Sequence, residues 1–387
     1  MIPQPTLRPR NPRFGSGPVR KFPHTSFESQ DDILGVSHRS ARGLALLQRV
    51  LTQLRDVLDI PPSYELAFIS GGGTGAMEFI LWNLLGIVPV DLFSNGVFGD
   101  HWLWDLQHEL KVPSLRSFVF DHGKVVDFSA VLPDHDTVFV WTETPSGTSV
   151  DAHAPWLATP RTGLTLCDAV SAVFCTPLPW ENLDAVAFSW QKGLGGEAGL
   201  GTVVLSPKAQ ERLQTHTPPW PRPRLFRPLL VEYDGQRGVS PTFWQGYTIN
   251  TVSLAVVEDM SRALSWATSQ GGLAGLLEKV RTHDDLVTRW VSQTEGFSFL
   301  VGQSAARAKQ VACIVVEDPK THQRADWTFL QKMARLLEEQ GVAWDILNHR
   351  QSVPCLRLWL GPTVETEDVE ALLPWLSWAR ERVSLGG

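Results

Sequence analysis

The segment from Leu164 to Gly193 decides the fold class, because it holds two short apolar runs that each end near a charged residue. The first run, LTLCDA, reaches Asp168, and the second, AVAFSWQKG, reaches Lys192, which is 24 residues later (192 − 168). Apolar runs with little polar alternation are typical of strands buried on both faces of a sheet. Because parallel sheets bind ligands beyond the carboxyl ends of their strands, we expect Asp168 and Lys192 at one ligand-binding edge.

The same alternation of apolar runs and helical stretches extends over most of the chain. Helical patterns separate several of the runs, as at 76–85 and 98–110. Such alternation predicts a mainly parallel, doubly wound α/β sheet. The predicted strands are those at 64–70, 90–94, 117–120, 137–141, 164–167, 185–188 and 202–205.

A smaller C-terminal α/β domain is expected beyond two long helices, 252–269 and 272–293. Its predicted elements are strands at 297–301, 311–316, 342–347 and 356–360 and helices at 326–340 and 367–383. Between the two regions, the proline-rich segment 217–228 cannot form a regular helix or a central strand, because proline removes a donor and fixes φ. We interpret this segment as a rigid loop over the sheet edge or the ligand site, with a proline-rich ligand for a partner domain as the alternative.

Composition excludes several classes of protein. The chain has 387 residues, of which 43% are hydrophobic and 19% charged, as is typical of two or three globular domains. Its 34 basic and 41 acidic residues give a net charge of −7, which argues against a general nucleic-acid binder. The four cysteines show no paired spacing, and no apolar stretch is long enough to span a membrane. We therefore expect a soluble cytoplasmic protein with no nucleic-acid or membrane partner.

Asp168 and Lys192 match the two groups that pyridoxal phosphate chemistry requires. A lysine holds the aldehyde of that cofactor as a Schiff base, and an aspartate keeps the pyridine nitrogen protonated. From the spacing alone, a buried ion pair or two rim charges without a catalytic role is the commoner explanation. The sequence Ser189-x-x-Lys192 also matches the S-x-x-K motif of serine acylases, but the companion S-D-N and K-T-G motifs are absent.

Other candidate ligand-binding groups are weaker signals when each is taken alone. The run Gly71–Gly75 lies between a predicted strand and helix and is either a phosphate cradle or a plain turn. The pairs His38–Arg39 and His349–Arg350, together with Arg357, suit anion recognition, but separately such groups are more often surface charges. No metal site is predicted from the helical stretch that carries His101, Asp105 and His108.

In their order, these segments resemble the phosphoserine aminotransferases, class V aminotransferases of PLP fold type I, and particularly their archaeal-type branch. The landmarks are Phe14–Pro18 (FGSGP), Val36–Ser40 (VSHRS), Gly71–Gly75, Leu164–Ala169, Phe188–Lys192 and Thr248–Thr251. The resemblance runs over most of the chain. It implies a large domain with a mainly parallel seven-stranded sheet (23–262), a smaller α/β domain (263–387) and an N-terminal arm (1–22) that joins the small domain.

The resemblance also implies a pyridoxal phosphate site. Lys192 would be the Schiff-base lysine, Asp168 would pair with the pyridine nitrogen, and Trp102 would stack on the pyridine ring. Thr144 would contact the ring hydroxyl. The groups expected around the cofactor phosphate are Gln191, Gly73, Thr74 and, from the neighbouring subunit, Asn250 and Thr251.

The implied substrate contacts come from two subunits, so a homodimer with shared active sites is expected. Ser16 and Arg357 would lie near the α-carboxylate of the substrate. The substrate's phosphate or distal carboxylate would meet His349–Arg350 and, from the neighbouring subunit, His38–Arg39. Two features depart from the bacterial pattern: many bacterial members have arginine at the position of Thr74, and the interval from Arg350 to Arg357 differs.

The activity implied by the resemblance is the reversible transamination of 3-phosphooxypyruvate with L-glutamate, which gives O-phospho-L-serine and 2-oxoglutarate in serine biosynthesis. Another class V enzyme is the alternative: an alanine– or serine–glyoxylate aminotransferase or, with less support, a cysteine desulfurase. Desulfurases need a reactive cysteine on a mobile loop, whereas Cys355 lies in an apolar, strand-like run. A non-enzymatic scaffold on a degenerate fold is a third hypothesis, and the presence of both Lys192 and Asp168 argues against it.

Overall fold

A computed structural model describes residues 2–23, 33–228, 230–233 and 236–385. Its main feature is a seven-stranded sheet with the strand order β1-β9-β8-β7-β4-β2-β3. Neighbouring strands are parallel except for β9, which is antiparallel to both β1 and β8. The strands are β1 (Glu65–Ser70), β2 (Val90–Ser94), β3 (Leu115–Val119), β4 (Asp136–Val140), β7 (Thr165–Asp168), β8 (Ala185–Ser189) and β9 (Leu200–Leu205). The predicted mainly parallel sheet of seven strands is confirmed.

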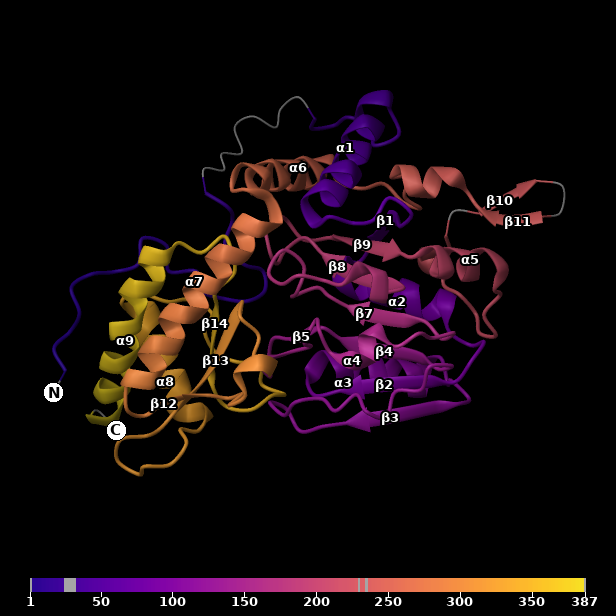
Figure 1. Cartoon of the computed structure of the whole chain (residues 1–387). Coiled ribbons are helices and arrows are strands. Elements are labelled where there is room, and N and C mark those ends of the chain that lie inside the picture. The colour runs from indigo at the N-terminus through magenta and orange to yellow at the C-terminus, as the bar shows by residue number, and fades with distance from the viewer. Residues whose placement is uncertain (1, 24–32, 229, 234–235, 386–387) are drawn as a thin grey trace.

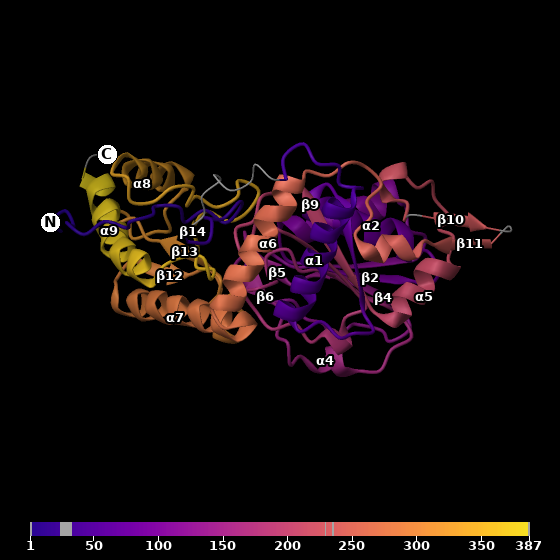
Figure 2. The ribbon, with the colours of Figure 1, turned by 90° about the horizontal axis from the view of Figure 1, so that it is seen from above.

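Helices cover both faces of this sheet (Figures 1 and 2). Along β8, Val186 and Phe188 pack with α1 (Ala41–Leu58) and α6 (Leu254–Ser269), whereas Ala185 and Ala187 pack with α2 (Gly72–Leu84) on the other face. Both faces are therefore apolar, which explains why the strand sequences show little polar alternation. The other helices of this domain are α3 (Val97–Trp104), the π-helix η2 (Asp105–Glu109), α4 (Pro155–Ala158), η3 (Trp180–Asn182), α5 (Pro207–Thr215), η4 (Arg224–Phe226) and η5 (Pro241–Gln245).

Helix α1 was not among the predicted elements, although its sequence explains it. Its buried residues recur at helical spacing: Leu46, Leu47, Val50, Leu51, Leu54, Val57 and Leu58. The Ser40 side chain caps the helix by accepting a hydrogen bond from the Gly43 backbone N–H at 3.1 Å. The apolar stripe packs on α6 and closes one face of the sheet.

The smaller domain is built on a three-stranded antiparallel sheet in the order β12-β13-β14. Its elements are β12 (Phe297–Phe299), η6 (Ser304–Ala306), β13 (Val311–Val316), β14 (Leu356–Trp359), α7 (Gly272–Gln293), α8 (Trp327–Glu339) and α9 (Thr366–Leu385). The strand predicted at 342–347 is wrong, because only the isolated bridges of Trp344 and Leu347 form there. Asp345 has a φ of 56°, a left-handed conformation that interrupts any extended run. The predicted domain boundary at 262/263 lies inside α6, and the division of the chain stays a prediction.

The remaining strands are short pairs outside the main sheets. β5 (Thr142–Glu143) and β6 (Thr148–Ser149) form a hairpin beyond the end of β4, and β10 (Leu230–Tyr233) pairs with β11 (Gln236–Val239).

The proline-rich segment packs on the C-terminal end of α2, where the Trp220 indole N–H donates to the Trp82 carbonyl oxygen at 3.0 Å. That end of α2 is opposite the sheet edge that carries Lys192. None of the helices described is both long and apolar enough to cross a membrane.

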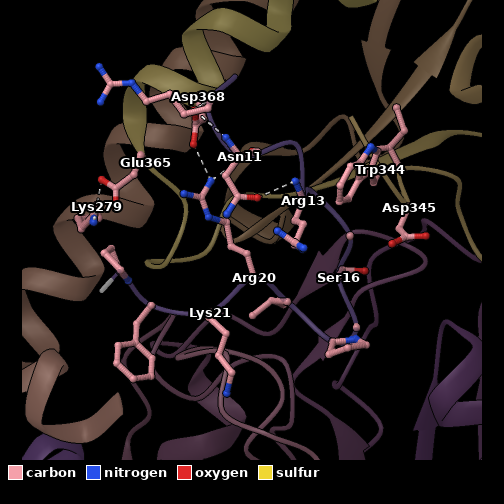
Figure 3. A pocket seen from close by; sticks show the side chains of 18 of the residues that line it. Asn11, Arg13, Ser16, Arg20, Lys21, Lys279, Trp344, Asp345, Glu365 and Asp368 are labelled. Carbon is pink, nitrogen blue, oxygen red and sulfur yellow. Dashed lines mark hydrogen bonds and ion pairs between the residues drawn. The ribbon is translucent and has the colours of Figure 1, made fainter. Parts of the chain in front are cut away.

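The N-terminal arm joins the small domain to the sheet edge (Figure 3). Phe14 and Val19 lie in the apolar core of the small domain, and the Val19 N–H donates to the Gln191 carbonyl oxygen at 3.0 Å. Arg20 is buried and donates to the Asp368 carboxylate at 2.7 Å. Asp368 also accepts the backbone N–H of Arg10 at 2.6 Å, so one carboxylate fixes two points of the arm.

Replacing Asp368 with alanine should cost about 3–5 kcal/mol of the free energy of unfolding, because Arg20 would stay buried without a partner. Urea unfolding followed by circular dichroism measures this loss. Glu339→Ala is the matched control, since its pair with Arg335 is largely exposed, and its unfolding midpoint should stay close to that of the wild type. Equal effects of the two substitutions would contradict the importance of the Arg20–Asp368 bond.

Candidate active site

The sheet brings Asp168 and Lys192 to one edge, as the sequence predicted. Asp168 is the last residue of β7, and Lys192 lies three residues beyond the end of the adjacent parallel strand β8. Both are buried, with 5% and 8% of their surface exposed. Each has its own hydrogen-bond partners: the Lys192 Nζ donates to the Ser16 carbonyl oxygen, and Asp168 accepts from Val170 N and Trp102 Nε1, both at 3.0 Å. Among the described residues, the two groups therefore bond to other partners and not directly to each other.

Burial brings the pKa values of these two groups close to neutrality. Burial and, after it, the positive charge of Arg357 lower the pKa of Lys192 to about 7, against the opposing charge of Asp168. Burial raises the pKa of Asp168 to about 6, against the two hydrogen bonds and the charge of Lys192. A lysine in this range has a large neutral fraction at pH 7, which makes its amine a nucleophile and a base.

The glycine run forms the start of α2, directly after β1. Gly71 has a φ of 92° and caps the helix without a side chain, so the N–H groups of Gly73 and Thr74 have no intrahelical or side-chain acceptor. A Cβ on Gly73 would lie 2.5 Å from Val170 Cγ2 and 3.1 Å from Ser189 Oγ. Only glycine therefore lets this helix terminus approach the ends of β7 and β8, where it forms an anion site.

Several buried polar atoms at this edge lack a hydrogen-bond partner among the described residues. They are Ser16 Oγ, Thr144 Oγ1, Ser189 Oγ, Gln191 Oε1 and Arg357 Nε. Leaving such atoms unpaired costs roughly 1–3 kcal/mol each, so the site is built to bind a polar molecule. An amine, a carboxylate, a helix N-terminus and free hydroxyls together fit pyridoxal phosphate.

Trp102 and Glu143 shape the region next to Asp168. Trp102 is buried on α3 and donates its indole N–H to Asp168; the expected stacking on a cofactor ring stays a prediction. Sequence reasoning missed Glu143, which is buried and accepts the Gly99 N–H at 2.6 Å. Burial, aided by the charge of Asp168, raises the pKa of Glu143 to about 8 against the hydrogen bond from Gly99. Its only signal in the sequence is a charged residue within the run TETPSG.

The predicted α-carboxylate residues meet at a cavity between the arm and the small domain. Ser16 and Arg357 both line this cavity, which has a volume of about 1770 Å³ (Figure 3). Arg357 lies on β14, and burial lowers its pKa. His349 lies close enough for the charge of Arg357, and that of His101, to add to burial in lowering its pKa. Arg350 is exposed and makes no hydrogen bond or ion pair with the part of the chain that the structure describes.

The four residues expected from a neighbouring subunit are not joined to Lys192 within one chain. Arg39 donates to His38 at 3.2 Å, just before α1, and no hydrogen bond or ion pair links either residue to Lys192, Asp168 or Arg357 in the described ranges. Asn250 accepts a hydrogen bond from Ser70, and the side chains of Asn250 and Thr251 are exposed.

The cysteines do not provide a reactive thiol. All four are free and buried, and Cys355 is completely enclosed. Cys313 donates its thiol to the Thr144 carbonyl oxygen at 3.2 Å, and its pKa is raised well above the ordinary value by a hydrogen bond with Cys355 and by burial. A thiol of this kind is inert, which argues against the desulfurase alternative.

Comparisons with known proteins agree with this geometry. The family model "Aminotransferase class-V" matches residues 119–372. A phosphoserine aminotransferase of Methanosarcina mazei is 37% identical over 381 residues, 98% of this chain and 100% of that protein. A phosphoserine aminotransferase structure from Cytophaga hutchinsonii covers 95% of this chain and 99% of its own, with a TM-score of 0.78 and 19% identity. An alanine–glyoxylate aminotransferase structure from Nostoc sp. has a TM-score of 0.77 at 20% identity, with coverage of 98% and 97%, so the fold alone does not separate the two activities.

In the ligand-free protein, the rate at which an aldehyde reagent modifies Lys192 should rise with pH and level off above about 7, because only the neutral amine reacts. Borohydride trapping and peptide mass spectrometry measure the rate at each pH. Arg357→Gln should move the midpoint to higher pH, since it removes a charge that lowers the pKa of Lys192, and Asp168→Asn should move it to lower pH. A wild-type midpoint near the ordinary lysine value of 10.5 would contradict the prediction.

Proposed function

The chain belongs to the class V aminotransferase family, and from its 37–38% identity to phosphoserine aminotransferases over nearly its whole length we infer that it is a phosphoserine aminotransferase that uses pyridoxal phosphate. It transfers the amino group reversibly between O-phospho-L-serine and 2-oxoglutarate, giving 3-phosphooxypyruvate and L-glutamate, a step of serine biosynthesis. The observation that carries this inference is the buried Asp168–Lys192 pair within a chain that matches such an enzyme along its whole length.

We propose that the residues of the sheet edge hold the cofactor. When bound, pyridoxal phosphate supplies an aldehyde for an amine and a ring that withdraws electrons from the substrate's α-carbon. Asp168 would face the ring nitrogen, since it ends the strand next to β8 and is the carboxylate whose charge acts most strongly on Lys192. The free N–H groups of Gly73 and Thr74 would bind the phosphate, with the orphaned side chains of Ser189 and Gln191 beside them. Thr144 would meet the ring hydroxyl.

Lys192 would perform the proton transfers. With a pKa of about 7, its Nζ exists in both the neutral and the protonated form near neutral pH, so it can take a proton from the substrate's α-carbon and return it elsewhere. The Ser16 carbonyl oxygen accepts a hydrogen bond from Nζ and so ties the amine to the N-terminal arm, whose Ser16 lines the cavity. Burial keeps bulk water away from Nζ and so keeps its pKa low.

Positive side chains at the cavity would select a substrate with two anionic ends. The Arg357 guanidinium, whose Nε is buried without a partner, suits a bidentate bond to the α-carboxylate, with Ser16 beside it. His349 and Arg350 would bind the far phosphate or carboxylate. In a homodimer with shared sites, the partner subunit's His38 and Arg39 would complete this end, and its Asn250 and Thr251 would reach the cofactor phosphate.

We also propose a cytoplasmic location. All four cysteines are free thiols, as expected in a reducing compartment. The reaction uses only small charged metabolites, which are available there.

Lys192→Ala should reduce turnover of phosphoserine with 2-oxoglutarate to background, because no other described amine lies buried at this sheet edge. A coupled assay of glutamate formation measures the rate. Arg350→Ala should lower kcat/KM for phosphoserine by about 10- to 100-fold and that for alanine far less, since it removes a charged contact to the phosphate alone. Wild-type protein that prefers alanine or serine to phosphoserine would overturn the assignment.

Mixing two inactive variants tests whether the active sites are shared. If Arg39 acts across the interface, a hybrid of Lys192→Ala and Arg39→Ala subunits has one site with both lesions and one with neither. Refolding an equal mixture should therefore restore about a quarter of the wild-type activity, because half of the dimers are hybrids. Mixing Lys192→Ala with Asp168→Asn is the control, since both lesions lie in one chain's site and no hybrid site is intact. Failure of the first mixture to gain activity would contradict the shared site.

A further inference from the structure

Glu143 is a buried carboxylate that the proposed mechanism leaves without a role. It is the last residue of β5, three positions beyond Val140, which pairs with Asp168 across β4 and β7. Only 1% of its surface is exposed. No lysine, arginine or histidine forms an ion pair with it in the described part of the chain, so backbone groups alone compensate its burial. Such a costly group needs a reason to be there.

One end of Glu143 holds helix α3. Its Oε1 accepts the Gly99 N–H at 2.6 Å, and its Oε2 faces the Phe98 N–H at 3.4 Å. These N–H groups belong to the first turn of α3, where no intrahelical acceptor exists and Gly96 supplies no capping side chain. These hydrogen bonds and the helix dipole favour the ionised form, but burial outweighs them and raises the pKa of Glu143 to about 8, so the group can cap the helix without being fully ionised at neutral pH. Glu143 therefore caps α3 from another element of the fold.

The helix that Glu143 caps carries Trp102. The indole N–H of Trp102 donates to Asp168 Oδ2 at 3.0 Å, so the position of α3 determines one of the two hydrogen bonds on the Asp168 carboxylate. Movement of the first turn of α3 would change both the indole and the carboxylate that would face the cofactor ring.

The backbone of Glu143 holds the hairpin turn that presents Thr144. The Glu143 carbonyl oxygen accepts the Gly147 N–H at 2.8 Å and the Ser146 hydroxyl at 3.3 Å, which closes the turn between β5 and β6. Within that turn Thr144 Oγ1 is buried and unpaired. Within this turn, only the Glu143 side chain forms hydrogen bonds with α3. Glu143 therefore connects the β5–β6 turn, which carries Thr144, with α3, which carries Trp102.

Gly96 is shaped to admit this carboxylate. A Cβ on Gly96 would lie 2.6 Å from both the Cδ and the Oε2 of Glu143. The φ of Gly96 is −176°, an extended conformation that any residue adopts, so the backbone itself does not require glycine. Glycine is needed at this position because the Glu143 side chain occupies the space that a Cβ would fill.

We propose that Glu143 is a positioning residue that fixes Trp102 and Thr144 in one arrangement around Asp168 and so preorganises the cofactor site. This inference rests on the proposed function, because it assigns Trp102, Thr144 and Asp168 to pyridoxal phosphate. Glu143 acts through these three residues and does not itself touch the cofactor.

Two substitutions of Glu143 distinguish the loss of the whole side chain from the loss of its acid group alone. Glu143→Ala removes both acceptors and leaves a hole, so the dissociation constant of pyridoxal phosphate should rise by about tenfold or more. The visible circular dichroism of the bound cofactor should change as well. Glu143→Gln keeps the shape and one acceptor for the Gly99 N–H, and should stay within about threefold of the wild type. In the cofactor-free protein, the near-ultraviolet circular dichroism assigned to Trp102 by a Trp102→Phe difference should weaken in Glu143→Ala only.

A double-mutant cycle with Gly96 tests the contact itself. Gly96→Ala should weaken cofactor binding because its methyl group displaces the carboxylate. In the Glu143→Ala background the same methyl group has room, so the double variant should bind no worse than Glu143→Ala alone. Additive effects of the two substitutions would overturn the proposal.

Asp136→Asn is the matched control for a general loss of stability. Asp136 is also fully buried, lies at the opposite end of β4 and accepts the Leu164 N–H at 2.7 Å. This variant should unfold at lower urea but keep the cofactor affinity and the dichroism of the wild type. If it changes them as Glu143→Ala does, or if Glu143→Ala leaves them unchanged, the inference fails. Failure of the proposed function looks different, since the wild-type protein would then bind no pyridoxal phosphate.

Discussion

The burial of two opposite charges at the ends of adjacent strands is the constraint on which the rest of the structure depends. Taking an amine and a carboxylate out of water costs several kcal/mol per ion unless the surroundings compensate. A direct ion pair would compensate most simply, but it would also keep both groups charged and the amine unreactive. Here two N–H donors stabilise Asp168 and one carbonyl oxygen accepts from Lys192, and burial, the largest cause, brings the pKa of each group near neutrality.

This constraint explains why one site needs three parts of the chain. The carbonyl oxygen that accepts from Lys192 belongs to Ser16 on the N-terminal arm, and the charge that lowers the pKa of Lys192 belongs to Arg357 in the small domain. The arm reaches this position because Phe14 is buried in the small-domain core and its carbonyl oxygen accepts the Trp359 N–H at 2.8 Å. Packing in the small domain therefore determines the environment of Lys192 at the sheet edge. Loss of the contacts that hold the N-terminal arm would change the environment of the Lys192 amine before it destabilised the sheet.

The sequence predicts those features whose cause is local. All seven strands of the large sheet were predicted because each contains a short, largely apolar run, and Asp168 and Lys192 were found because they stand at or just beyond the ends of such runs. The run 342–347 is equally apolar, but a left-handed Asp345 interrupts it, and nothing in the neighbouring residues signals that conformation. Glu143 was missed because its partners, the N–H groups of Phe98 and Gly99, lie more than 40 residues away in the sequence. Both are backbone groups, so the residue types at these positions do not reveal the contact. The expected role of His38 and Arg39 depends on a second chain, which no property of one chain's fold can supply.

The distribution of charge shows how an acidic chain can bind two phosphate-bearing molecules. The anion site proposed at the start of α2 consists of backbone N–H groups, and the side chain beside them is the neutral Thr74, where the sequence resemblance implied arginine in many bacterial members. Neutral N–H donors at the start of a helix would bind the phosphate of a cofactor that stays bound, without adding a charge beside Lys192. The pKa of Lys192 is already lowered by Arg357. An additional arginine there would lower that pKa further, whereas Arg357 and the other proposed substrate cations would act on a molecule that must also leave. The proposed separation of neutral donors for the cofactor from charged donors for the substrate is therefore compatible with a net charge of −7 and with the lowered pKa of Lys192.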